Sequence, residues 1–350
     1  MFFSKKLKKY RGHNVQHLYK YSFFFLFMML GIECTAHTFG IGIVNRGKIL
    51  ANIKDMYKTE KGGIVPIESA KHHKEVAEKV YKWALEKANI KEGDIDAIAI
   101  SNAPGLAPCL YAGMEFAKKK AKELGIKMIG VNHCIAHLEI GRSVGARDSV
   151  LLYASGANTQ IIAYAAGKYR VFGETLDVGI GNFIDKFARH IGLGFPGGPE
   201  IEKLAGNGKY MELPYSIKGM DVSFSGMQTK LQQLYDKGFK KEDLSFSLQE
   251  TAFAMLVEAS ERAMAHVGKK ELVLGGGVAC NKRLQEMCRI MCEERGAKFF
   301  CPENSLLTDN AAMIAYTGEL IFYANAGIFE PDKIDIKPRE RTDDVIVSWR

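Results

Sequence analysis

The sequence predicts an α/β protein built from two similar halves. Apolar, β-branched segments typical of strands alternate with segments of helical periodicity along most of the 350 residues. A pattern of strand, small or polar turn, strand, glycine turn and strand begins near residue 31 and recurs near residue 153. The alternation favours largely parallel sheets, and the repeat indicates two facing lobes whose polar turns point into a cleft.

The order of elements follows from composition and periodicity. Runs rich in β-branched and apolar residues predict strands at 30–35, 40–45, 48–54, 95–101, 127–131, 149–154, 160–165, 169–175, 271–275 and 297–301. Apolar spacing of about 3.6 residues predicts helices at 67–89, 110–124, 134–144, 181–192, 198–206, 242–267, 279–295 and 309–326. We expect a first lobe at 29–147 and a second lobe at 148–350, with a helical insertion in the second.

Composition and charge are those of an ordinary soluble globular protein, with 47% hydrophobic and 25% charged residues. Six of the eight net positive charges lie in residues 1–28, so the body carries no strong electrostatic signal for nucleic acid. The apolar run after this basic segment lacks a cleavage site and is too short to span a bilayer. We therefore expect 1–28 to be a disordered extension or a misassigned start, with no membrane partner.

The seven cysteines include no Cys-x-x-Cys pair, which fits reduced thiols in a cytoplasmic protein. A chemical signal comes instead from His133 and His137. Histidines four apart lie on one face of a helix and can bind one metal ion, although the same spacing also occurs by chance. Cys134 stands where a zinc-protease helix carries its glutamate base, so an ion here would hold or polarise a ligand. Asp309, before the last helix, is either an N-cap or a further metal ligand.

Two glycine-rich turns follow strands, at 155–159 and 275–277. Such turns present backbone N–H groups to a phosphate, and the second also precedes a helix N-terminus. Neither matches a Walker motif or a dinucleotide turn. Each alone is more often structural, but together they favour phosphate binding. Asp185 and Glu202 lie near glycine-rich helix starts, where a carboxylate either binds ribose hydroxyls or caps a helix.

Longer motifs add a family resemblance. The most distinctive are Asn-His-Cys-Ile-Ala-His-Leu-Glu at 132–139, Gly-Met-Asp-Val-Ser-Phe-Ser-Gly at 219–226 and Ser-Leu-Gln-Glu-Thr-Ala-Phe-Ala-Met-Leu-Val-Glu at 247–258. They resemble the universal tRNA threonylcarbamoyladenosine-synthesis transferase family, most closely its archaeal and eukaryotic branch, the catalytic subunit of the KEOPS complex. The resemblance extends from about residue 30 to the last residue.

This resemblance implies an actin-like ATPase (ASKHA) fold with a nucleotide and metal cleft between its lobes. It implies one divalent metal, Fe²⁺ or Zn²⁺, held by His133, His137, Tyr153 and Asp309. It implies an ATP- or AMP-type nucleotide bound by Tyr153, Ala154, Ser155, Gly156, Ala157, Asp185, Gly198, Glu202 and Asn281. His37, in the polar turn of the first repeat, is our candidate for a general base or a donor-orienting group, with a structural role as the alternative.

The implied reaction transfers L-threonylcarbamoyl from threonylcarbamoyl-AMP to N6 of adenosine 37 in tRNAs that read ANN codons. The implied partners are tRNA and the other KEOPS subunits, including a small atypical Ser/Thr kinase on a separate chain. Ala157 and Ala107 replace glycines usual in the family, and a positive φ at Ala157 would strain the backbone. The alternatives are an actin-like ATPase, a scaffold in a tRNA-modifying assembly, and a metalloprotease, which lacks its glutamate.

Overall fold

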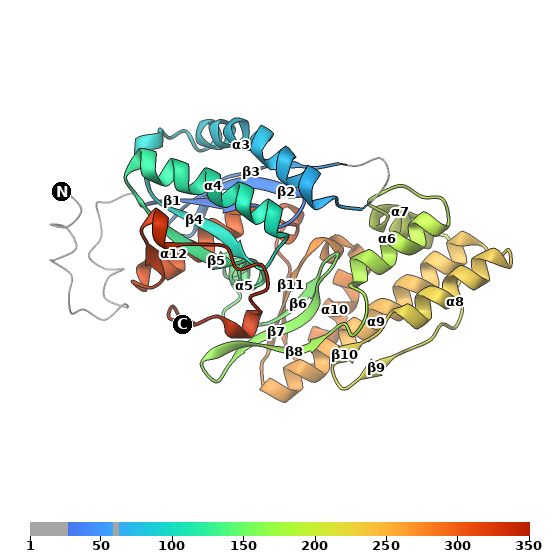
Figure 1. Cartoon of the computed structure of the whole chain (residues 1–350). Coiled ribbons are helices and arrows are strands. Elements are labelled where there is room, and N and C mark those ends of the chain that lie inside the picture. The colour runs from blue at the N-terminus through green and yellow to red at the C-terminus, as the bar shows by residue number, and fades with distance from the viewer. Residues whose placement is uncertain (1–26, 59–62) are drawn as a thin grey trace.

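The computed structural model describes residues 27–58 and 63–350, and most of the predicted 1–28 extension lies outside these ranges. Two mixed sheets form its framework (Figure 1). The first has the order β13-β5-β4-β1-β2-β3, from β1 (Met28–Glu33), β2 (Thr38–Asn45), β3 (Lys48–Met56), β4 (Ile95–Ala103), β5 (Lys127–Asn132) and β13 (Ile328–Phe329). The second has the order β12-β11-β6-β7-β8, from β6 (Val150–Ala154), β7 (Thr159–Ala165), β8 (Lys168–Glu174), β11 (Glu271–Gly275) and β12 (Lys298–Phe300).

The two sheets repeat one topology, which confirms the internal repeat. Strands β1, β2 and β3 form an antiparallel meander, and β1, β4 and β5 then pair in parallel. Strands β6, β7 and β8 form the second meander, and β6, β11 and β12 pair in parallel. A separate ribbon pairs β9 (Ile217–Lys218) with β10 (Asp221–Val222).

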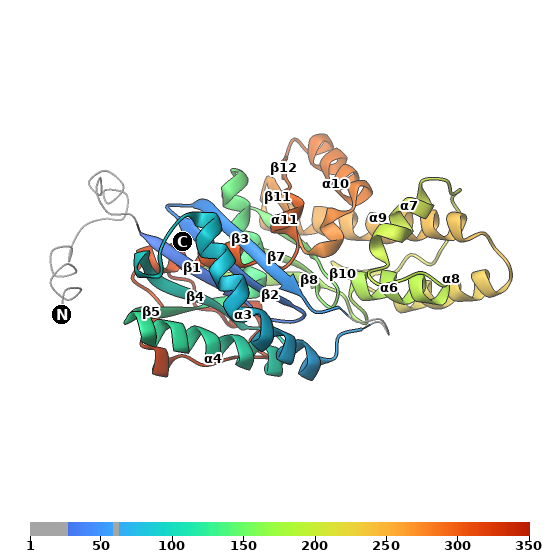
Figure 2. The ribbon, with the colours of Figure 1, turned by 90° about the horizontal axis from the view of Figure 1, so that it is seen from above.

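Helices cover both sheets (Figures 1 and 2). Helices α3 (Pro66–Ala88) and α4 (Ala107–Leu124) pack on one face of the first sheet, and α12 (Ala311–Tyr323) packs on the other. Around the second sheet lie α6 (Ile180–His190), α7 (Gly198–Ala205), α8 (Ser225–Asp236), α9 (Lys241–Val267) and α10 (Lys282–Glu294). None of the helices in the described ranges is long and apolar enough to cross a membrane.

Helix α5 (His133–Glu139) lies between the two sheets, and all of its residues are buried. Ala136 packs with strands of the first sheet, whereas Ile135 and Leu138 pack with strands of the second. The helix begins directly after β5 because the Asn132 side chain accepts hydrogen bonds from two backbone N–H groups of the first turn, at 3.1 and 3.3 Å. The position of α5 therefore depends on both lobes.

Helix α12 approaches the first sheet so closely that two strands need glycine. A β-carbon at Gly31 would lie 2.3 Å from the carbonyl oxygen of Ala311, and one at Gly42 would lie 2.4 Å from the carbonyl carbon of Ala311. Both α12 and β13 come from the 148–350 segment, yet they pack on the first sheet. The division of the chain into lobes at 29–147 and 148–350 thus stays a prediction. In the structure, the last part of the 148–350 segment returns to the first sheet.

We expect Gly42→Ala to lower the free energy of unfolding by about 1–3 kcal/mol, because the new methyl group would overlap backbone atoms of α12. Gly93→Ala is the matched control, since no atom lies within 4 Å of the position its β-carbon would occupy. Urea unfolding followed by circular dichroism measures both. Equal stability of the two variants would show that α12 is not seated on the sheet as described.

Candidate functional site

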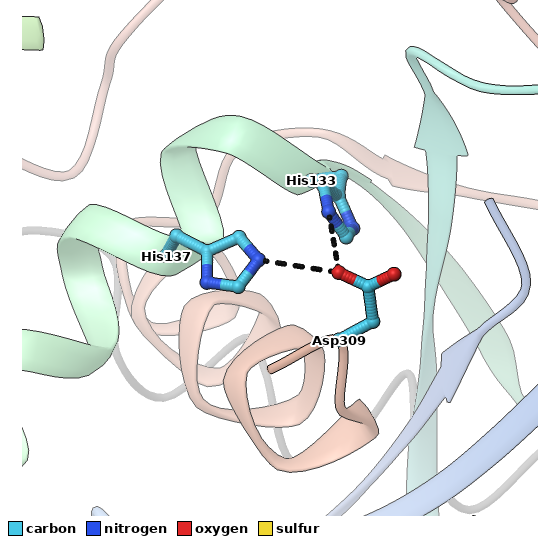
Figure 3. A group of neighbouring side chains, drawn as sticks. All are labelled: His133, His137 and Asp309. Carbon is cyan, nitrogen blue, oxygen red and sulfur yellow. Dashed lines mark ion pairs between the residues drawn. The ribbon is translucent and has the colours of Figure 1, made fainter. Parts of the chain in front are cut away.

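Side chains from two distant segments meet beside α5. His133 and His137 come from α5, Asp309 comes from the loop between α11 (Asn304–Leu307) and α12, and their ligand atoms all lie within 4.8 Å of one another (Figure 3). Oδ1 of Asp309 is 3.4 Å from Nε2 of His133 and 3.7 Å from Nε2 of His137. Ligands ~2.1 Å from a shared tetrahedral ion are about this far apart.

The structure distinguishes between the two roles considered for Asp309, helix N-cap and metal ligand. The N-cap of α12 is Asn310, whose side chain accepts a hydrogen bond from the backbone N–H of Met313 at 3.0 Å. Asp309 is therefore not needed to cap the helix, and its carboxylate faces the histidines instead. This arrangement fits a metal ligand.

Tyr153 completes the group from the second sheet. It lies in β6, is 1% exposed, and places its hydroxyl 3.0 Å from Nε2 of His133. Its ring centroid is 4.7 Å from that of His137. Burial raises the pKa of the Tyr153 phenol, so the hydroxyl is neutral when no cation lies beside it. The structure thus brings together all four residues that were predicted to bind the metal.

Glu33 is a further member of the site that the sequence did not predict. It lies at the end of β1, is fully buried, and places Oε2 2.9 Å from Nδ1 of His133. Its other oxygen accepts hydrogen bonds from the backbone N–H and the hydroxyl of Thr35, at 2.8 and 2.5 Å. A carboxylate on Nδ1 orients the ring so that Nε2 is directed at a metal. The only signal in the sequence was an acidic residue inside an apolar strand.

The electrostatic environment of the two histidines and Asp309 also favours a bound cation. Burial alone would lower the pKa of His133, but Glu33, Tyr153 and Asp309 raise it well above its usual value. Burial lowers the pKa of His137. For Asp309, burial acts to raise the pKa, but the two histidines hold it well below its usual range. His137 is thus a neutral imidazole, and neither of its buried ring nitrogens has a hydrogen-bond partner among the described residues. An unpartnered neutral imidazole beside a carboxylate is a suitable pair of metal ligands.

The turn between β6 and β7 was predicted to cradle a phosphate. It is closed by a hydrogen bond from the backbone N–H of Ser155 to the carbonyl of Asn158 at 2.9 Å. The carbonyls of Ser155 and Gly156 accept hydrogen bonds from Gly181 and Asn182 in the first turn of α6, at 3.0 and 2.9 Å. The turn is therefore packed against the N-terminus of α6, whose dipole favours an anion nearby. The N–H groups of Ile180, Gly181 and Asn182 already donate to Thr159, Ser155 and Gly156, so the turn itself would have to bind a phosphate.

The two alanines that replace family glycines do not strain the backbone. Ala157 does not have a positive φ. Ala107 is the first residue of α4 and follows the N-cap Leu106, so its backbone is helical. The concern that a methyl group at Ala157 forces an unfavourable backbone conformation is thus removed.

The second glycine turn lies against the first. Gly276 has φ +93°, and a β-carbon there would lie 2.3 Å from the carbonyl oxygen of Ala154. Beyond this turn, Asn281 caps α10 by accepting hydrogen bonds from two backbone N–H groups at 2.9 and 3.2 Å. Glu202 accepts a hydrogen bond from the backbone N–H of Lys282, in the same first turn, at 2.8 Å. Asn281 and Glu202 are therefore neighbours at one helix start.

Asp185 occupies a comparable position at another helix start. Its Oδ1 accepts a hydrogen bond at 2.7 Å from the backbone N–H of Gly197, the residue before Gly198 at the start of α7. Burial raises the pKa of Asp185. Asp185 and Glu202 thus both bind helix-start N–H groups, and contact with a nucleotide remains a proposal for them.

His37 lies in the turn between β1 and β2, as expected. Its carbonyl accepts a hydrogen bond from the backbone N–H of Tyr57 at 2.8 Å. Its Nδ1 is buried and has no hydrogen-bond partner in the described part of the chain. The contacts described for His37 include none of the four residues predicted to bind the metal, which we call the metal set: His133, His137, Tyr153 and Asp309. The catalytic role of His37 therefore stays a proposal.

Comparison with known proteins identifies the family. A family model for tRNA N6-adenosine threonylcarbamoyltransferase matches residues 48–316. The curated transferase of that name from Thermococcus sibiricus is 54% identical over 91% of this chain and 99% of its own length. The one from Archaeoglobus fulgidus is 51% identical over the same shares. A probable bifunctional tRNA threonylcarbamoyladenosine biosynthesis protein from Methanosarcina mazei is 52% identical over 92% of this chain, which spans 59% of that protein.

Solved structures identify the fold. Component A of (R)-2-hydroxyglutaryl-CoA dehydratase from Acidaminococcus fermentans aligns with a TM-score of 0.53 and 15% identity over 83% of this chain and 98% of its own. HypF from T. kodakarensis aligns with a TM-score of 0.61 and 14% identity over 86% of this chain and 49% of its own. At these identities the likeness shows the fold alone, and it confirms the predicted actin-like ATPase fold. The family match and the relatives at 51–54% identity show that the chain belongs to the tRNA N6-adenosine threonylcarbamoyltransferase family and is a transferase.

Proposed function

We propose that the protein transfers the L-threonylcarbamoyl group from threonylcarbamoyl-AMP to N6 of adenosine 37 in tRNAs that read ANN codons. The observation that carries this proposal is the position of Tyr153. Its hydroxyl lies in the metal set, and its backbone leads directly into the turn 155–158. A donor held by its phosphate at that turn would therefore have its reactive carbonyl close to the metal set.

His133, His137, Tyr153 and Asp309 would hold one divalent ion, Fe²⁺ or Zn²⁺. When bound, such an ion supplies Lewis-acid stabilisation of negative charge on donor oxygens. Glu33 keeps His133 oriented for this role. The burial of the histidines limits water near the donor, which favours transfer to the amine over hydrolysis.

The remaining parts of the donor would lie on the second lobe. The backbone N–H groups of 155–157 and 275–277, apart from those of Ser155 and Gly276 that donate to protein carbonyls, would bind the phosphate. Asp185, Gly198, Glu202 and Asn281 would contact the nucleoside. A structure of full-length HypF in its phosphate- and nucleotide-bound form aligns with this chain at a TM-score of 0.58. That shared fold supports binding of an ATP- or AMP-type nucleotide here.

In the transfer, N6 of the adenine forms a bond to the carbonyl carbon of the donor. The bond from that carbon to the phosphate oxygen breaks, AMP leaves, and N6 loses a proton. His37, in the polar turn of the first repeat, would accept this proton or orient the donor. The metalloprotease alternative gains no support, because Cys134 is buried among apolar side chains where that reaction needs a carboxylate base.

The proposed partners are tRNA and the other subunits of KEOPS, with a cytoplasmic location. The relatives named as bifunctional tRNA threonylcarbamoyladenosine biosynthesis proteins are longer than this chain, which spans 59–61% of their length. Their extra length supports a second protein that works with this one. We propose that this is the small atypical Ser/Thr kinase.

The function is tested with the protein, its partners, labelled threonine, bicarbonate, ATP and tRNA. We expect label on adenosine 37, and we expect the double variant His133→Ala, His137→Ala to lose the bound ion by elemental analysis and to lower transfer at least ~100-fold. Unchanged metal content would rule out the site. Intact metal without label on tRNA would favour a scaffold, and ATP hydrolysis without label would favour an ATPase.

We expect Asp185→Ala and Glu202→Ala each to weaken AMP binding about 10-fold, the effect of losing one hydrogen bond to a charged group. Isothermal titration calorimetry measures the affinity. Glu200→Ala, which removes an exposed carboxylate from the first turn of α7, the helix that also carries Glu202, serves as the control and should leave AMP affinity unchanged. AMP affinity equal to that of the unaltered protein would remove Asp185 and Glu202 from the nucleotide site.

We expect His37→Ala to slow single-turnover transfer by about 100-fold, the usual contribution of a general acid or base, while metal content stays unchanged. His190→Ala, at an exposed pair with Asp236 in the second lobe, is the control. Full transfer by the His37 variant would assign this histidine a structural role.

A further inference from the structure

A short segment, 304–309, connects the two lobes at the site. It contains α11, which packs beside β11 and the 3₁₀ turn Gly277–Cys280 of the second lobe. The carbonyl of Leu307 accepts a hydrogen bond from the backbone N–H of Gly276 at 2.8 Å. Two residues later the same segment supplies Asp309. The segment 304–309 therefore joins the glycine turn of the second lobe to the metal set.

Strand β3 of the first lobe holds the other side of this segment. Side chains alternate along a strand, so Asn52 and Lys54 share one face, and Asp55 points to the other, where it pairs with His72 on α3 at 3.0 Å. Asn52 donates a hydrogen bond to the carbonyl of Ser305 at 3.3 Å. Two side chains on one face of an edge strand thus face the segment 304–309.

Lys54 contacts the end of the segment that carries the metal ligand. Its Nζ donates hydrogen bonds to the hydroxyl of Thr308 at 2.6 Å and to the carbonyl oxygen of Asp309 at 3.0 Å. Both acceptors belong to the two residues that precede Asn310, the N-cap of α12. Lys54 is half-buried, so its ammonium group benefits from such acceptors in place of water.

Lys54 is also within electrostatic reach of both proposed sites. Burial lowers the pKa of Lys54, and Asp309, Cys280 and Glu33 act in the opposite direction. Asp309 is a proposed metal ligand, Glu33 orients His133, and Cys280 ends the turn that leads into Asn281. The Lys54 side chain thus lies at the junction of the two lobes, close to residues of both the proposed metal site and the proposed nucleotide site.

We propose that Lys54 is a positioning residue that fixes Asp309 for the metal and thereby couples the metal set to the glycine turn at 275–277. This inference rests on the metal and nucleotide sites of the proposed function. With Nζ bound to Thr308 and to the Asp309 backbone, the Asp309 carboxylate stays within 3.4 and 3.7 Å of the two histidines. A ligand that moves the turn at Gly276 would act on the same segment through Leu307.

The test uses Lys54→Met, which keeps most of the apolar stem and removes the ammonium group. The affinity of the full-length protein for Zn²⁺ is measured by competition with a chelator, with and without AMP. We expect Lys54→Met to weaken Zn²⁺ binding by about 10-fold or more, as for other residues that orient a metal ligand. We also expect AMP to change Zn²⁺ affinity in the unaltered protein but not in Lys54→Met.

Lys48→Met is the matched control, because it removes the same charge from an exposed position on the same strand. It should keep both the Zn²⁺ affinity and the AMP effect. Thr308→Val removes one acceptor of Lys54, and the double variant should bind Zn²⁺ no more weakly than Lys54→Met alone. Thermal unfolding of each variant separates loss of positioning from loss of fold, and Thr308→Val tests the contact should Lys54→Met fail to fold.

Unchanged Zn²⁺ affinity in Lys54→Met, or additive effects in the double variant, would overturn the positioning role. An AMP effect that persists in Lys54→Met would overturn the coupling. These outcomes differ from failure of the proposed function itself, in which the unaltered protein would show no Zn²⁺ binding that depends on His133 and His137.

Discussion

The complete burial of α5 between two sheets is the constraint on which the site depends. A helix in that position must satisfy every polar side chain without water. Glu139 forms ion pairs with Arg142 and Arg350, at 2.5 and 3.0 Å, and His133 pairs with Glu33. His137 is the polar side chain of α5 that the described residues leave without a hydrogen bond, and it faces Asp309. The packing of the helix thus leaves the His137 ring facing Asp309, an arrangement that fits the proposed metal site.

The residues proposed to contact the nucleotide share a second feature, which is their position at helix starts. Asp185, Glu202 and Asn281 each accept hydrogen bonds from backbone N–H groups at the beginning of a helix. These contacts stabilise the helices and also fix the direction of each polar side chain. Capping and ligand binding are therefore compatible roles for one residue. The two readings that the sequence left open for these carboxylates do not exclude one another.

Much of the fold could be predicted because its long elements carry strong periodic patterns. The helix expected at 242–267 is α9 (Lys241–Val267), and the strand expected at 48–54 is β3 (Lys48–Met56). Helix α8 was not predicted, since its buried face consists of Met227, Leu231 and Leu234 alone. The strands β9, β10 and β13 have two residues each, too few for any alternation to be visible. The four-residue helix α11 is likewise too short to show a period.

Within the site, the gathering of His133, His137, Tyr153 and Asp309 was predicted, but mainly through the family resemblance. Glu33 and Lys54 could not be found from the sequence, because their partners are 100 and about 255 residues away. Only the fold places β1 beside α5, and only the return of the chain through 304–309 places Asp309 beside β3. Local patterns do not contain such pairings.

The close seating of α12 on Gly31 and Gly42 also bears on the thermodynamics of ion binding. Asp309 lies two residues before Ala311, whose backbone fills the space above both glycines. Its main chain is therefore ordered by backbone packing on one side and by Lys54 on the other. The loss of conformational entropy needed to arrange this ligand occurs when the chain folds. An ion bound at the proposed site would then meet a preorganised carboxylate, and its binding energy would not be consumed in ordering a loop.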